Sequence, residues 1–172
     1  MSPEPSQRKS ESPSPKNSAA AGIVRLLTKR NETLALAESC TGGLVAHQIT
    51  NVPGASKILK GGIVAYSNEA KEKFLGVRPA TLEQHGAVSK ETAAEMADGA
   101  RKQFDADYAI AVTGIAGPTG GTAEKPTGTV FIAVAGSFGI IVEQKLNRLS
   151  REKFKEATAG QALELLKKHT LP

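Results

Sequence analysis

Three short apolar segments, separated by helix-like stretches, constrain the fold of this chain most strongly. They are "TLALA" (33–37), "GGIVAY" (61–66) and "DYAIAV" (107–112). None of them alternates cleanly between apolar and polar residues, which is typical of strands whose two faces are both covered by helices. The sequence therefore predicts an α/β fold, a three-layer α/β/α sandwich whose sheet has a parallel core.

Two further apolar segments, "GTVFIAVAG" and "IIVEQKLN", follow later in the chain and are separated by a short link that contains glycine. This spacing predicts a β-hairpin. The expected sheet is therefore mixed, with the hairpin as its antiparallel edge.

Helix-like segments accompany these strands. The clearest spans 89–104, where Ser89 is a good N-cap and Ala93, Ala97, Ala100 and Phe104 fall on one face. Further helices are predicted over Ala19–Arg30, from Thr41, over 68–75 with Gly76 closing the helix, and over 151–168, and Arg78-Pro79 is predicted to start another turn.

The length of 172 residues fits a single domain with a sizeable core. Residues 1–18 are rich in Ser and Pro and have nothing apolar beyond Met1, so we expect a disordered tail there. The folded domain is expected to span residues 19–172.

The net charge of +5 raises the question of a polyanionic partner. Lys and Arg are scattered among Asp and Glu, and aromatic residues make up only 4%, too few for a set of base-stacking platforms. We therefore expect an anionic small molecule as the partner and not nucleic acid. No apolar run approaches the roughly 18 residues of a membrane span, so no membrane partner is expected.

The lone cysteine, Cys40, excludes an internal disulfide and fits a reducing compartment. The first residues also lack the apolar region of a secretory signal, so a cytoplasmic location is expected. The histidines (His47, His85 and His169) lie far apart in the sequence. Because no ligand cluster is visible, neither a metal nor a cofactor is expected.

In open α/β sheets, ligands bind beyond the carboxyl ends of the strands. Three segments occupy that place here: "ESCTGG" after the first strand, "YSNEAK" after the second and "TGIAGPTGG" after the third. We expect the chemistry of the protein to lie among them.

The segment "SCTGG" leads into a predicted helix, whose free N–H groups would favour an anion near Thr41, Gly42 and Gly43. In the alternative interpretation, Ser39 or Thr41 simply caps that helix. Either Ser39 or Cys40 could be a nucleophile, since a thiolate is also stabilised at a helix N-terminus. Adjacent strand residues point to opposite faces, so only one of the two is expected to reach the cleft.

The glycine-rich segment 113–121 matches no standard phosphate-binding motif. So much glycine after a buried strand would still let the backbone approach a ligand closely. A flexible connection is the alternative interpretation. The candidate ligand-binding residues of this segment are Thr113, Gly114, Gly117, Gly120 and Gly121.

Lys71 of "YSNEAK" breaks a local rule. If Ser67 or Asn68 caps the helix, the cation of Lys71 falls in the first turn, at the positive end of the helix dipole. The dipole would lower the pKa of this lysine, as a general base requires. A solvated surface lysine is the alternative interpretation.

Taken together, "AESCTGGLVA", "GGIVAYSNEAK", "EQHGAVSKETA" and "VTGIAGPTGGTAEKPTGTVFIAVA" resemble the C-terminal domain family of the competence/damage-inducible CinA proteins. The resemblance covers residues 20–168 in order. It implies hydrolysis of the carboxamide of nicotinamide mononucleotide to nicotinate mononucleotide and ammonia, without a metal, by a homo-oligomer of the α/β/α fold.

By the same resemblance, Ser39 is the nucleophile, and Tyr66 and Lys71 activate it. A family arginine at the start of the last helix usually follows Gly-Asp, whereas this chain reads "NRLSREKF". Arg151 matches that arginine by position, and Arg148 competes with it. A non-catalytic nucleotide-binding module of the same fold is the alternative function.

Overall fold

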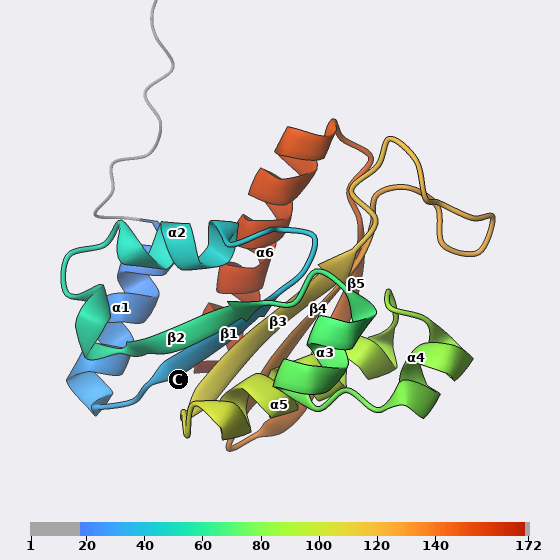
Figure 1. The fold of residues 1–172 in the computed structure, drawn as a ribbon. Coiled ribbons are helices and arrows are strands. Elements are labelled where there is room, and N and C mark those ends of the chain that lie inside the picture. The colour runs from blue at the N-terminus through green and yellow to red at the C-terminus, as the bar shows by residue number, and fades with distance from the viewer. Residues whose placement is uncertain (1–17, 171–172) are drawn as a thin grey trace, which may run out of the picture.

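The computed structural model describes residues 18–170 (Figure 1). In chain order, its elements are α1 (Ala19–Arg30), β1 (Leu34–Glu38), α2 (Leu44–Thr50), the 3-10 helix η2 (Ala55–Lys57), β2 (Leu59–Val64), α3 (Asn68–Leu75), α4 (Pro79–His85), α5 (Lys90–Gln103), β3 (Tyr108–Gly114), β4 (Thr129–Gly136), β5 (Gly139–Leu146) and α6 (Arg151–Thr170). The predicted tail lies outside the described residues except for Ser18, which is the N-cap of α1.

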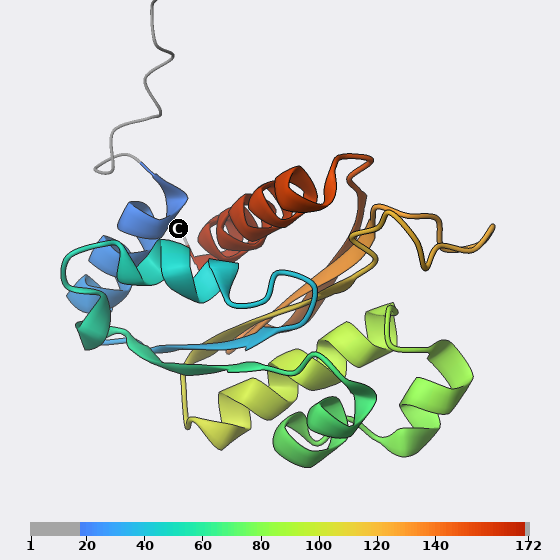
Figure 2. The ribbon, with the colours of Figure 1, turned by 45° about the horizontal axis from the view of Figure 1, so that its top comes forward.

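The strands form one mixed sheet in the order β2-β1-β3-β4-β5. β1 pairs in parallel with β2 and β3, whereas the β4–β5 hairpin continues the sheet in the antiparallel direction. Helices α1, α2 and α6 cover one face, and α3, α4 and α5 cover the other (Figure 2). The predicted three-layer sandwich with a parallel core and an antiparallel edge is confirmed.

The two faces of the sheet carry side chains of different size. Leu36, Ile110 and Ile132 belong to the core beneath α1, α2 and α6. Their strand neighbours Ala37 and Ala111 belong to the core beneath α5. The small residues let α5 pack close to the sheet.

Helix α3 is held close to α5 as well. A Cβ atom at Gly99 of α5 would collide with the backbone oxygen of Leu75 at the end of α3. Only glycine permits this approach of the two helices. The packing fixes the position of α3, which carries Lys71.

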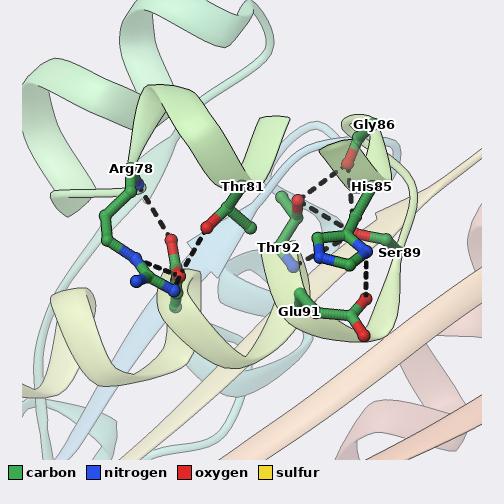
Figure 3. Close-up of polar contacts among 8 residues, drawn as sticks. Arg78, Thr81, His85, Gly86, Ser89, Glu91 and Thr92 are labelled. Carbon is green, nitrogen blue, oxygen red and sulfur yellow. Dashed lines mark hydrogen bonds and ion pairs between the residues drawn. The ribbon is translucent and has the colours of Figure 1, made fainter. Parts of the chain in front are cut away.

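Polar contacts anchor α4 and the loop after it on α5 (Figure 3). The carboxylate of Glu95 accepts hydrogen bonds from the Arg78 backbone N–H at 2.8 Å and from the Thr81 hydroxyl at 2.7 Å. At the other end of α4, the hydroxyls of Ser89 and Thr92 donate to the Gly86 carbonyl at 3.1 and 2.8 Å. The loop 86–88 is therefore held in a defined place.

Helix α2 begins at Leu44, three residues later than the sequence predicts. Gly42 and Gly43 have φ angles of +61° and +101°, in the left-handed region. Residues in that conformation cannot belong to a right-handed helix. The segment after β1 is therefore a tight turn, and the helix follows it.

Candidate active site

The three segments predicted from the sequence meet in one cavity of about 290 Å³ beyond the carboxyl ends of β1 and β3. The loop before α5 and the start of α6 close it. Its lining consists of Ser39, Cys40, Tyr66, Asn68, Lys71, Ala87, Val88, Thr113, Gly114, Ile115, Ala116, Gly117, Thr119, Gly120 and Arg151.

Ser39 and Lys71 form a buried pair on the floor of this cavity. The Lys71 Nζ lies 3.1 Å from the Ser39 Oγ and 3.0 Å from the Ala65 carbonyl oxygen. Only 2% of Lys71 is exposed to solvent. Ser67 caps α3 and accepts a hydrogen bond from the Ala70 N–H, which places Lys71 at the start of the helix and turned inward.

Burial lowers the pKa of Lys71 below its ordinary value, because desolvation penalises the charged form. A thiolate at Cys40 would raise that pKa. The Cys40 thiol, however, is itself buried, and its pKa is raised to about 12. At neutral pH this thiol carries no charge, so it does not offset the lowering of the Lys71 pKa by burial.

Cys40 lines the cavity beside Ser39, so the expectation that only one of them would reach the cleft is wrong. Strand β1 ends at Glu38, and both residues lie in the turn after it, where strand alternation no longer applies. The two differ in their contacts. Cys40 packs in the hydrophobic core, whereas the Ser39 hydroxyl contacts the Lys71 amine.

Tyr66 and Arg151 stand at the mouth of the cavity. The Arg151 guanidinium donates to the Tyr66 hydroxyl at 2.7 Å and to the Gly117 carbonyl at 2.8 Å. Tyr66 is 60% exposed and has no hydrogen bond to Ser39 or Lys71 among the described residues. Of the two candidate arginines, Arg151 lines the cavity and Arg148 does not.

The glycine-rich segment after β3 forms one wall. Thr113, Gly114, Gly117 and Gly120 line the cavity, whereas Gly121 does not. A Cβ atom at Gly121 would lie 2.5 Å from the Thr127 nitrogen, so the chain folds back on itself there. Gly121 therefore shapes the loop without facing the cavity.

The other predicted anion site, at the start of α2, is already occupied by Glu38. This buried carboxylate accepts hydrogen bonds from the Thr41 hydroxyl at 2.6 Å and from three backbone N–H groups, those of Gly43, Val45 and Ala46, at 2.8–3.1 Å. Thr41, Gly42 and Gly43 do not line the cavity. Glu38 is absent from the residues predicted above, although a carboxylate at the end of an apolar strand is the signal that could have found it.

A second cavity, of about 440 Å³, adjoins the first and shares Arg151 with it. The start of α6 and Leu44 of α2 line it, and Lys155 contributes a second cation. Lys155 is also absent from the predicted residues. Its place one helical turn after Arg151 is the signal that could have found it.

Within residues 18–170, no group of three or more His, Cys, Asp or Glu side chains is arranged to hold a metal ion. Nor is any helix in that range both long and apolar enough to cross a membrane. His85 contacts Glu91 at 3.7 Å and does not line the cavity.

Comparisons with known proteins place the chain in a family. The model of the CinA C-terminal domain matches residues 16–170. A CinA-like protein of Shewanella denitrificans is 50% identical over 157 residues, which cover 91% of this chain and 37% of that protein. A CinA-like protein of an Anaeromyxobacter species is 49% identical over 152 residues, covering 88% and 37%.

The chain thus spans little more than a third of the length of these curated relatives. A structural neighbour is similar over nearly its whole length. The competence/damage inducible protein CihA from Agrobacterium tumefaciens is 40% identical, with a TM-score of 0.87, over 93% of this chain and 98% of that one. The chain belongs to the CinA C-terminal domain family.

Proposed function

We propose that this protein hydrolyses the carboxamide of nicotinamide mononucleotide to nicotinate mononucleotide and ammonia. The observation that carries the proposal is the buried contact between the Ser39 hydroxyl and the Lys71 amine. A hydroxyl becomes a useful nucleophile only when a base can take its proton. The CinA-type segments that surround this pair suggest the substrate.

In the first half of the reaction, the Ser39 Oγ attacks the carboxamide carbon and its proton passes to Lys71. A neutral amine has one lone pair and two N–H groups. One N–H can donate to the Ala65 carbonyl at 3.0 Å, which leaves the lone pair free to face the Ser39 hydroxyl. The lowered pKa of Lys71 favours this neutral form.

The tetrahedral intermediate then collapses, the carbon–nitrogen bond breaks, and the amino group leaves as ammonia with the proton that Lys71 had taken. In the second half, Lys71 removes a proton from water, which attacks the ester carbon. The bond to Ser39 breaks, Lys71 returns the proton to the Ser39 oxygen, and nicotinate mononucleotide is released.

The developing oxyanion needs hydrogen-bond donors. The amides at the start of α2 already donate to Glu38. Gly117 and Gly120 line the cavity, and their backbone N–H groups donate to no acceptor within residues 18–170. In this proposal the glycine-rich wall supplies the donors, while Arg151 and Tyr66 orient the ligand at the mouth.

The test is release of ammonia from nicotinamide mononucleotide by the purified chain, with the acid product identified by mass spectrometry. We expect stoichiometric amounts of the two products. Tight binding of the nucleotide without ammonia release would overturn the proposal and indicate a nucleotide-binding module.

A further inference from the structure

The two adjoining cavities differ in what they contribute to a ligand site. The smaller one holds the Ser39–Lys71 pair, in which the base must lose its charge to act. The larger one is lined by two basic side chains, those of Arg151 and Lys155. Arg151 lines both cavities and is the side chain that they share.

Lys155 differs from the other lysines of α6. Lys153, Lys167 and Lys168 each lie within 4 Å of a carboxylate: Glu156, Glu164 and Glu143, respectively. Lys155 is partly buried, and its ammonium has neither an ion pair nor a hydrogen bond within residues 18–170. A half-buried cation without a partner, lining a cavity, is suited to an anionic ligand.

The position of Lys155 connects it to the turn that carries Ser39. Its Nζ lies 3.6 Å from the point that a Cβ atom at Gly42 would occupy. The ammonium therefore lies beside the turn that follows β1. The start of α2 offers no competing anion site, because Glu38 takes its N–H groups.

We propose that the second cavity receives the phosphate of the substrate and that Lys155, with Arg151, selects a nucleotide over its dephosphorylated nucleoside. This inference rests on the proposed function for the identity of the substrate. Two carboxylates also line the cavity. Glu156 is held by Lys153 at 2.8 Å, so its charge is compensated. The negative charge of Glu152 repels the phosphate and lowers the affinity for the nucleotide.

The experiment compares nicotinamide mononucleotide with nicotinamide riboside, which has the same carboxamide and no phosphate. The variants are Lys155→Met, Lys155→Arg and the control Lys168→Met, which removes an equal charge from the far end of the same helix. Steady-state ammonia release gives kcat and KM, and calorimetry gives direct binding to each ligand.

For the nucleotide, Lys155→Met should raise KM and Kd by about tenfold or more, the usual size of a lost charge-assisted hydrogen bond, with kcat little changed. For the riboside, kcat/KM should be the same as in the wild type. Lys155→Arg should restore most of the affinity, and Lys168→Met should behave as the wild type.

The inference would be overturned if Lys155→Met lost equal affinity for the nucleotide and the riboside, or if its affinity for the nucleotide were unchanged. Calorimetry separates this failure from that of the proposed function. If the wild type binds the nucleotide without releasing ammonia, the hydrolysis fails while the affinity ratio still tests Lys155. If the wild type binds no nucleotide at all, both proposals are overturned.

Discussion

Lys71 and Lys155 carry the same side chain in two adjoining cavities, yet their surroundings differ. Lys71 is 2% exposed, contacts a hydroxyl and a carbonyl, and has a lowered pKa. Lys155 borders the larger cavity without a partner among residues 18–170. The difference shows how one residue type can serve two purposes. In the proposed reaction, burial favours the neutral form of Lys71 that a base requires, whereas Lys155 lies beside a cavity that an anion can enter.

The largest expected effect concerns Ser39, the proposed nucleophile. Ser39→Ala removes the oxygen that is proposed to attack the carboxamide, so kcat for ammonia release should fall by at least about a thousandfold. Nucleotide binding measured by calorimetry should change little, because the second cavity remains intact. Near-normal turnover in this variant would mean that Ser39 is not the nucleophile.

The pH dependence of kcat tests whether Lys71 acts as a general base. A general base works in its deprotonated form, so the rate should fall up to tenfold per pH unit as pH decreases through the pKa of Lys71. Because burial lowers that pKa below its ordinary value of 10.5, the rate should reach half of its maximum below pH 10.5. A half-maximal rate at pH 10.5 or above would indicate an unperturbed lysine.

A substitution at Glu38 tests whether the N–H groups at the start of α2 stabilise the fold or bind a ligand. Glu38→Gln removes the charge that receives four hydrogen bonds, so the free energy of unfolding should fall by about 1–3 kcal/mol. The melting temperature should drop by roughly 3–10 °C. Glu69→Gln, the same change in the exposed first turn of α3, is the matched control and should shift it far less.

The smallest effect is expected at Cys40. Its pKa of about 12 leaves almost no thiolate at pH 8, so iodoacetamide should modify the folded protein far more slowly than the protein unfolded in guanidinium. Cys40→Ala should also keep most of the activity. Rapid alkylation of the folded chain together with loss of turnover would make Cys40 the nucleophile instead.

Much of this arrangement follows from local sequence patterns. The apolar segments predict the strands, and the rule that ligands bind beyond strand ends is enough to bring the segments of Ser39, Lys71 and Gly117 to one place. The Ser67 cap predicts that Lys71 lies at the start of α3, which the structure confirms.

The remainder depends on contacts that no local pattern contains. The carboxylate of Glu38 accepts hydrogen bonds from the N–H groups of Gly43, Val45 and Ala46, and no periodicity in the sequence predicts such a contact. The turn after β1 brings Ser39 and Cys40 into one cavity against strand alternation. The position of Lys155 depends on how α6 packs beside α2, which is tertiary structure that no local sequence pattern predicts.

Lys71 is proposed to act as a base in its neutral form, and the same substitution at both lysines distinguishes that role from a purely electrostatic one. Arginine keeps the charge but does not deprotonate in proteins. In single-turnover experiments at saturating nicotinamide mononucleotide, Lys71→Arg should slow ammonia release by at least about a hundredfold, whereas Lys155→Arg should leave it within a few-fold of the wild type. Lys71→Met, run beside Lys71→Arg, separates loss of the base from steric misfit. A rate near that of the wild type in Lys71→Arg would contradict the account, because the charge of Lys71 would then suffice.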